Sequence, residues 1–141
     1  MWYNKSKDFI CEGVKQLARS ESMEDYLETI LLLGKKLPVV RGVDIANEMN
    51  FKKSSVSVAM KKMRDLKLIT VTEQGYIYLT DAGKAMAEDI YERHTVIAQV
   101  LMELGVEESV ALEDACRIEH ALSMDSFEAI KKHRIEKTSQ Q

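Results

Sequence analysis

The chain has 141 residues, of which 45% are hydrophobic and 30% are charged, and its formal net charge is −3. This length suits one domain, or two small domains that share a core. Two cysteines cannot build a disulfide framework, no secretory signal opens the sequence, and apolar runs such as residues 30–33 are far too short to cross a bilayer. We therefore expect a soluble protein of the cytoplasm that has no membrane partner.

The charges are divided unevenly along the chain. Residues 38–80 contain seven Lys or Arg against four Asp or Glu, which leaves +3, whereas residues 81–128 contain three against twelve, which leaves −9. Because phosphate contacts are made by one face of a protein, the acidic average does not exclude DNA binding by the basic segment. The acidic segment is suited to hold a cation.

The first part of the chain predicts two helices. Residues 1–20 predict a short amphipathic extension, to which we assign no chemistry. A stronger helix is predicted from Ser22, as its N-cap, to about Gly34. Asp25 and Glu28 stand three residues apart on one face of this helix. On their own, a capping box at Ser22 and Asp25 and favourable charges in the first turn account for this acidic pair.

The most specific architectural pattern follows. A short helix over residues 43–49 and a second helix over residues 54–66, joined by the polar connection 50–53, predict a helix-turn-helix. Two β-branched and aromatic runs around a turn at residues 73–75 predict a β-hairpin, the wing. Residues 21–80 are therefore predicted to form a winged-helix DNA-binding domain.

The second helix of this motif separates two faces. Val56, Met60 and Met63 recur at helical spacing and predict its buried stripe. The opposite face of such a helix reads base edges in the major groove and holds phosphates, and an apolar side chain on it suits a thymine methyl group. A solvated lysine face on a purely structural winged helix is the alternative. The residues predicted to contact double-stranded operator DNA are Lys52, Lys53, Ser54, Ser55, Ser57, Val58, Lys61 and Lys62.

Three further helices complete the chain. Thr80 is expected to cap a long helix over residues 81–104, which Gly105 ends. A helix around Cys116 and a last helix over residues 123–132 are predicted from their apolar periodicity. The fold class is therefore predicted as mainly α, with an N-terminal winged helix-turn-helix and its β-hairpin wing followed by an all-helical domain.

Cys116, Glu119 and His120 stand at positions i, i+3 and i+4 of their helix, so they share one face within a single turn. A thiolate, a carboxylate and an imidazole together suit Fe(II), Zn(II), Co(II) or, through the carboxylate, Mn(II). A half-buried cysteine beside a solvated Glu–His pair explains the pattern equally well, because three helical ligands leave coordination positions unfilled. A lone helical histidine such as His94 is likewise more often a surface or core residue than a ligand.

Four separated segments occur in one order: residues 22–28 (SMEDYLE), the winged helix, residues 91–94 (YERH) and residues 114–120 (DACRIEH). Over residues 22–132 the chain resembles the family of metal-dependent repressors that includes the diphtheria toxin repressor and the manganese transport regulator. The resemblance implies that residues 81–135 form a metal-binding and dimerisation domain. It also implies ligands for one or two divalent ions at Asp25, Glu28, His94, Cys116, Glu119 and His120.

The chain departs from both branches of this family. The manganese-sensing branch has a carboxylate at the position of Cys116, whereas the iron-sensing branch has the cysteine but a methionine at the position of Asp25. Mn(II) and Fe(II) are therefore both expected as corepressors, and Zn(II) or Co(II) could replace them in vitro. Ala98 and Leu112 replace residues that complete the ancillary site of the iron branch. We expect no SH3-like domain of the kind found in longer members, and a disordered tail over residues 136–141.

The resemblance implies a homodimeric repressor, in which the metal holds two recognition helices in a geometry that fits a palindromic operator, and which controls genes for metal uptake. A different winged-helix regulator, which senses a small molecule or oxidation through Cys116 without any metal, is the alternative. An enzyme with a carboxylate-bridged metal pair would need repeated Glu-x-x-His pairs on facing helices. The sequence lacks these pairs, a nucleophile beside a base, and a glycine-rich phosphate loop.

Overall fold

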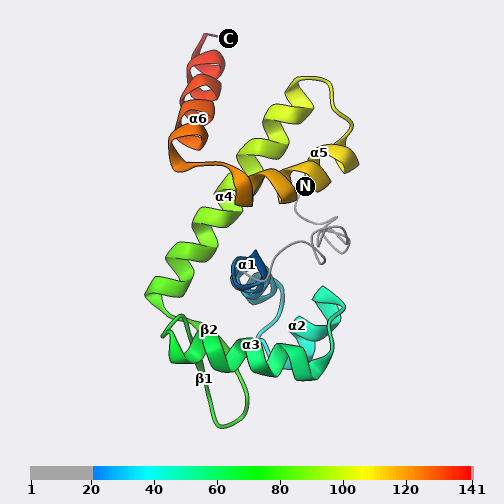
Figure 1. Cartoon of the computed structure of the whole chain (residues 1–141), viewed down its shortest axis with the longest axis vertical. Helices are drawn as coiled ribbons and strands as arrows, with labels where there is room; N and C mark the ends of the chain where they lie inside the picture. The colour runs from blue at the N-terminus through cyan, green and yellow to red at the C-terminus, as the bar shows by residue number, and fades with distance from the viewer. Residues whose placement is uncertain (1–20, 141) are drawn as a thin grey trace. The chain divides into compact units, whose positions relative to one another are not determined.

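The computed structural model describes residues 21–140, with side chains from residue 23 onward. Six helices and a two-stranded antiparallel sheet make up this part of the chain (Figure 1). The chain divides into two compact units between Ile90 and Tyr91, so the division falls inside a long helix. The mainly helical fold class with one hairpin is confirmed. The helix predicted within residues 1–20 lies outside the described residues.

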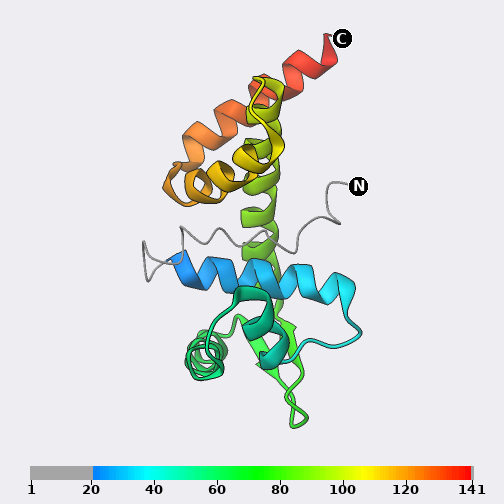
Figure 2. The ribbon, with the colours of Figure 1, turned by 90° about the vertical axis from the view of Figure 1, so that its right-hand side faces the viewer.

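The first unit is a helix-turn-helix followed by a β-hairpin, as predicted. Its elements are α1 (Glu21–Lys36), α2 (Gly42–Met49), α3 (Lys53–Asp65), β1 (Ile69–Val71), β2 (Ile77–Leu79) and the first turns of α4 (Asp81–Glu103). Helix α1 packs against α2 and β2, while α3 packs against α2 and β1. The hairpin extends beyond α2 and α3, so that its loop is accessible (Figure 2).

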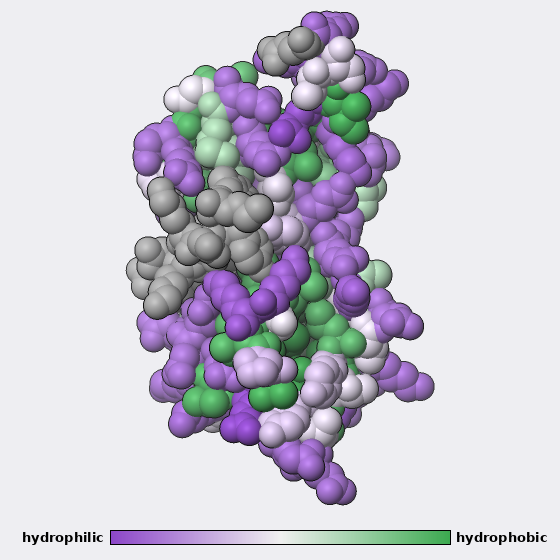
Figure 3. All heavy atoms as spheres, turned by 180° about the vertical axis from the view of Figure 1, so that it is seen from behind, coloured by the Kyte–Doolittle hydropathy of each residue, from purple (hydrophilic) through white to green (hydrophobic). Residues whose placement is uncertain are grey.

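Apolar side chains from each of these elements meet in one core. Each buried side chain of this size contributes roughly 1.5–3 kcal/mol by leaving water. Figure 3 shows one face of the surface, seen from behind the view of Figure 1. Hydrophilic side chains dominate this face, and apolar side chains gather between them in its lower half. Deeply buried members of the core include Leu27, Ile30, Ile45, Met49, Val56, Met63, Ile69 and Ile77.

The turn between α2 and α3 depends on Asn50, whose φ of 54° lies in the left-handed region. Asparagine tolerates this conformation better than most residues, because its short side chain bonds locally. The backbone N–H groups of Asn50 and Phe51 both donate to the carbonyl oxygen of Ala46, which ends α2. Lys52 already has the extended backbone of an N-cap, so α3 begins at Lys53 rather than at the expected residue 54.

The wing is a short hairpin in which Ile69 pairs with Leu79 and Val71 with Ile77. Its loop closes at Gly75, whose φ of 82° is a conformation that residues with a Cβ rarely adopt. The N–H of Ile77 also donates to the carbonyl oxygen of Val40, at a distance of 2.8 Å. The wing is therefore attached by main-chain bonds to the segment that precedes α2.

Thr80 caps α4 as predicted and also ties the helix start to the end of α3. Its Oγ1 accepts from the N–H of Gly83 at 3.1 Å and donates to the carbonyl oxygen of Lys67 at 2.7 Å. The backbones approach so closely here that a Cβ on Gly83 would lie 1.9 Å from the carbonyl oxygen of Leu68. Only glycine fits at this position.

The second unit contains the rest of α4, α5 (Glu108–Ala121) and α6 (Met124–Ser139). Gly105, with a φ of 98°, ends α4 as predicted, and the N–H of Val106 donates to the carbonyl oxygen of Leu101. Ion pairs join α6 to α4: Nζ of Lys131 lies 2.5 Å from Glu92, and Nε of Arg134 lies 3.2 Å from Glu103. The buried apolar residues of this unit are Val96, Ile97, Ala98, Ala111, Ala115 and Phe127.

The last helix is longer than the sequence indicated. It was expected to end near Lys132, before a disordered tail, but α6 continues to Ser139. No glycine or proline follows Lys132 to stop it, and Thr138 and Ser139 donate back to carbonyl oxygens one turn earlier. Among residues 21–140, no helix combines the length and the apolar character that crossing a bilayer requires.

We expect Gly83→Ala to lower the free energy of unfolding by about 1–3 kcal/mol, because the new methyl group must displace the backbone at Leu68. Gly34→Ala is the matched control, since Gly34 is exposed within α1 and a Cβ there meets nothing within 4 Å. That control should stabilise the protein by up to about 1 kcal/mol. Urea unfolding measures both changes, and an equal stability of the two variants would contradict the packing at Gly83.

Candidate metal centre

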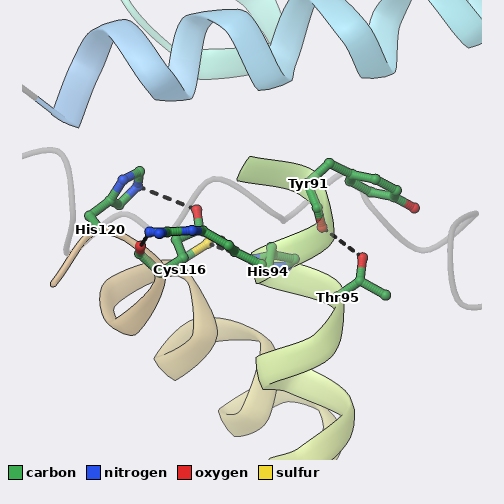
Figure 4. Close-up of polar contacts among 7 residues, drawn as sticks. Tyr91, His94, Thr95, Cys116 and His120 are labelled. Atoms are coloured by element: carbon green, nitrogen blue, oxygen red, sulfur yellow. Dashed lines mark hydrogen bonds and ion pairs between the residues drawn. The ribbon is translucent and has the colours of Figure 1, made fainter. Parts of the chain in front are cut away.

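Three donor atoms from two helices converge inside the second unit. Nδ1 of His94, on α4, lies 3.0 Å from Oε2 of Glu119 and 3.7 Å from Sγ of Cys116, both on α5. All three donor atoms lie within 4.8 Å of one another. Figure 4 shows His94 and Cys116 facing each other, with His120 further along α5. Three of the six predicted ligands are thus brought together across 22 to 25 residues of sequence.

Helix α5 supports this arrangement in two ways: it places two donor residues on one side, and it has small residues at its other buried positions. Its spacing brings Cys116 and Glu119 to the same side, and its other buried positions, Ala111 and Ala115, carry only a methyl group. Short side chains at a helix contact allow the helix axes to approach closely. At the N-terminus of α5, hydrogen bonds from the Ser109 side chain and backbone hold the pKa of Glu107 below its ordinary value, so this cap carries the negative charge that a helix start favours.

Glu119 is the most unusual residue of the site, because its charged side chain is completely buried. Oε2 contacts His94 at 3.0 Å, and Oε1 lies 3.3 Å from Nε2 of His120. A buried carboxylate costs several kcal/mol unless it is hydrogen-bonded or paired with positive charge. Two imidazole groups and one thiol around one carboxylate form a donor set that either protons or a cation can satisfy.

The three converging donors fit a divalent ion. An ion that binds nitrogen, oxygen and sulfur at its usual bond lengths keeps these donors roughly 3.3–3.8 Å apart in a tetrahedral site. The observed separations of 3.0 Å and 3.7 Å lie close to this range, so small side-chain rotations suffice. The mixture of imidazole, carboxylate and thiolate suits Fe(II), Co(II) and Zn(II), and the carboxylate also suits Mn(II).

Of the three remaining predicted ligands, His120 belongs to the second unit and the other two belong to the first. Asp25 and Glu28 stand three residues apart on α1 and are partly exposed. Helix α1 begins at Glu21, so Ser22 lies within the helix and is not its N-cap. The predicted capping box of Ser22 and Asp25, which explained this pair without any metal, is therefore wrong. The prediction that the two carboxylates share one face of the helix is unaffected.

The predicted DNA-contacting residues all lie on the exposed surface of the first unit. Val56, Met60 and Met63 form the buried side of α3, as predicted. Val58, an apolar residue on the opposite side, is 71% exposed. The exposed residues are Lys52, Lys53, Ser54, Ser55, Ser57, Val58, Lys61 and Lys62.

Two long-range arginine contacts were missed by sequence reasoning. Nη2 of Arg41 donates to the hydroxyl oxygen of Tyr76 at 3.2 Å, and its guanidinium lies 4.9 Å from the ring centre, which fixes the start of α2 against the wing. Arg93 donates to the carbonyl oxygen of Glu119 at 3.0 Å, so it contacts the main chain of a residue whose side chain belongs to the cluster. The only signal for Arg93 was its place directly before His94, and no local pattern indicates how far a long side chain reaches.

Comparison with known proteins assigns the chain to two successive domains of one family. Residues 19–77 match the N-terminal DNA-binding domain of the iron dependent repressors, and residues 80–134 match their metal-binding and dimerisation domain. An uncharacterised HTH-type transcriptional regulator of Methanocaldococcus jannaschii is 37% identical over 114 residues, which cover 79% of this chain and 91% of that protein.

Two further relatives extend the comparison. The transcriptional regulator MntR of Escherichia coli O6:H1 is 29% identical over 84% of this chain and 76% of its own length. The solved structure of the manganese regulator SloR superposes with a TM-score of 0.70 at 28% identity, over 79% of this chain. The chain spans about half the length of SloR, since the match covers 52% of it. With its winged helix, its convergent donors and these matches, the chain belongs to the iron dependent repressor family of metal-dependent transcriptional regulators.

Proposed function

We propose that the protein represses transcription as a homodimer, with Mn(II) or Fe(II) as its corepressor. The observation that carries the proposal is the convergence of His94, Cys116 and Glu119 in the unit that matches a metal-binding and dimerisation domain. The exposed face of α3, in the unit that matches a DNA-binding domain, would bind the operator DNA. A repressor shares a compartment with its operator, so we place the protein in the cytoplasm.

A divalent ion, when bound, supplies the positive charge and coordination bonds that a buried carboxylate and a thiolate need. Glu119 provides the negative charge at the centre of the cluster, and its burial excludes water from that point. His94 would provide an imidazole nitrogen as a donor, since its Nδ1 lies 3.0 Å from Oε2 of Glu119. Cys116, half buried, provides the softest donor and therefore influences which metal is preferred.

Asp25, Glu28 and His120 complete the proposed ligand set. Their support is the sequence resemblance, the shared face of the two carboxylates on α1, and the contact of His120 with Glu119. Six ligands could fill one octahedral ion or be divided between two neighbouring ions of lower coordination number, so the set is consistent with one or two ions per subunit. Ligands drawn from both units would restrict the orientations of the DNA-binding unit. Apparent DNA affinity would then rise by the inverse of the fraction that is competent to bind.

The physiological metal has to be identified by its effect on DNA binding, because metal affinity alone does not identify it. The thiolate of Cys116 favours Fe(II), Co(II) and Zn(II), whereas carboxylate and imidazole donors accept Mn(II). The relative SloR is described as a manganese regulator, and the matching family models describe iron dependent repressors. Zn(II) exceeds Mn(II) and Fe(II) in affinity at nearly any such site, so the physiological metal is the one that activates DNA binding at the concentrations found in the cell.

On DNA, we propose that two copies of α3 enter successive major grooves. A dimer achieves this when its recognition helices lie roughly 34 Å apart, which requires a palindromic operator. In this proposal Lys61 and Lys62 hold phosphates, while Ser55 and Val58 contact base edges near the start of the helix; its support is that all four residues are exposed. The operators we expect are those of metal-uptake genes, because repression by the metal itself then closes a feedback loop.

Removing the metal is expected to weaken operator binding by roughly 10–100-fold, because only a small fraction of the apo dimer should have the competent geometry. The measurement is a binding titration on DNA selected from random sequence with Mn(II), before and after chelation. His94→Ala and Glu119→Gln should mimic chelation. His133→Ala is the control, since His133 is exposed on α6. Unchanged affinity after chelation would favour the metal-independent regulator instead.

Cys116→Ser is expected to abolish the sulfur-to-metal charge-transfer band that Co(II) gives with a coordinating thiolate. Cys11→Ser, the only other cysteine substitution that the sequence allows, should leave the band unchanged. Cys116→Glu should shift metal activation toward Mn(II), because oxygen donors suit the harder ion. If Cys116→Ser retains the parental response to every metal, the cysteine is a packing residue and not a ligand.

Lys61→Ala or Lys62→Ala is expected to weaken binding to all DNA sequences and to reduce the slope of log affinity against log salt by about one for each lost phosphate contact. Lys132→Ala is the matched control, because it removes an exposed lysine from α6 in the second unit. Salt titrations of the three variants decide the matter. Parental slopes for both α3 variants would show that DNA binds elsewhere.

A further inference from the structure

Arg93 reaches from α4 to the carboxyl end of α5. Its Nη1 donates to the carbonyl oxygens of Glu119, at 3.0 Å, and of Leu122, at 3.2 Å. Its Nη2 lies 3.7 Å from Sδ of Met124, and its guanidinium lies 5.4 Å from the ring centre of Phe127. One side chain of α4 therefore contacts the end of α5 and the first turn of α6.

These contacts replace hydrogen bonds that the helix cannot make for itself. The last carbonyl groups of a helix have no intrahelical N–H partner and need another donor. Both bonds come from Nη1, and the planar guanidinium holds this nitrogen in a fixed orientation, which the flexible ammonium group of a lysine does not. Its positive charge also suits the negative end of the helix dipole. Arg93 thus acts as a C-cap that a neighbouring helix supplies to α5.

Two adjacent residues of α4 consequently hold Glu119, one through its side chain and the other through its main chain. His94 contacts its carboxylate, and Arg93 binds its main-chain oxygen. We propose that Arg93 is a positioning residue for the metal centre: it fixes the last turn of α5, so that the donors of Cys116 and Glu119 stay within coordination distance of His94. The inference rests on the proposed function, because it assigns a role to Arg93 only if this cluster binds a metal.

Simple electrostatics predicts the opposite effect, which makes the inference testable by sign. A positive group close to a cation site repels the cation, so neutralising Arg93 would strengthen metal binding if charge alone mattered. If Arg93 positions the donors, neutralising it weakens metal binding even though a repulsive charge is removed. Groups that orient the ligands of a metal typically change its affinity by about 10–100-fold when they are lost.

The test compares three variants of the full chain by Co(II) titration against a competing chelator and by visible absorption, without DNA. Arg93→Met retains the aliphatic stem over Phe127 but loses the donors and the charge, while Arg93→Lys retains the charge without the fork. Arg117→Met is the control on α5, because Arg117 is exposed and, among residues 21–140, its ion pairs are with carboxylates outside the cluster, at 2.6 Å from Glu113 and 3.4 Å from Asp114.

We expect Arg93→Met to lower Co(II) affinity by about 10–100-fold and to alter the absorption bands, Arg93→Lys to lie between it and the parent, and Arg117→Met to lower nothing. Unchanged or tighter Co(II) binding by Arg93→Met, with a parental spectrum, would overturn the inference. Should circular dichroism show that Arg93→Met is unfolded, Arg93→Lys decides: weaker binding supports positioning and parental binding refutes it. A parent protein that gives no sulfur-to-cobalt band would refute thiolate ligation in the proposed function, and the positioning role with it.

Discussion

The carboxylate of Glu119 is withdrawn completely from water, and this burial constrains the rest of the second unit. Compensation comes from His94 on α4 at 3.0 Å and from His120 on α5 at 3.3 Å. Removing one partner of a buried charged pair costs about 3–5 kcal/mol, so the packing of α5 on α4 is tied to this polar cluster. A divalent cation compensates two negative charges whereas a proton compensates one, which is why a cluster that holds a buried carboxylate and a thiol suits a metal.

The first unit depends on a different constraint, the close approach of backbones. Asn50 turns the chain between α2 and α3, and Gly83 lies against the main chain at Leu68, where no side chain fits. Main-chain bonds also attach the wing, at Ile77, to Val40. Since these contacts do not depend on flexible side chains, the recognition helix and the wing are presented on a stiff support.

The distribution of charge along the sequence differs between the two units. The segment of residues 38–80, with its excess of basic residues, forms the exposed face of α3 and the wing, whereas residues 81–128, with their excess of acidic residues, form the helices around the cluster. Each segment matches a separate domain of the iron dependent repressors. The long helix α4 belongs to both units, and it carries His94 and Arg93 on consecutive positions just after the division.

The sequence by itself determined the faces of single helices, because a helix repeats every 3.6 residues and neighbours on one face are local in sequence. Val56 is buried and Lys61 exposed on α3 for this reason, and Cys116 shares its side of α5 with Glu119. Helical periodicity did not connect His94 with this cluster. The family resemblance suggested the connection, and the tertiary structure showed that His94, 22 residues away from Cys116, reaches it. The tertiary structure alone revealed the Arg93 cap. Contacts between helices depend on the packing of many buried side chains at once, and no local periodicity encodes them.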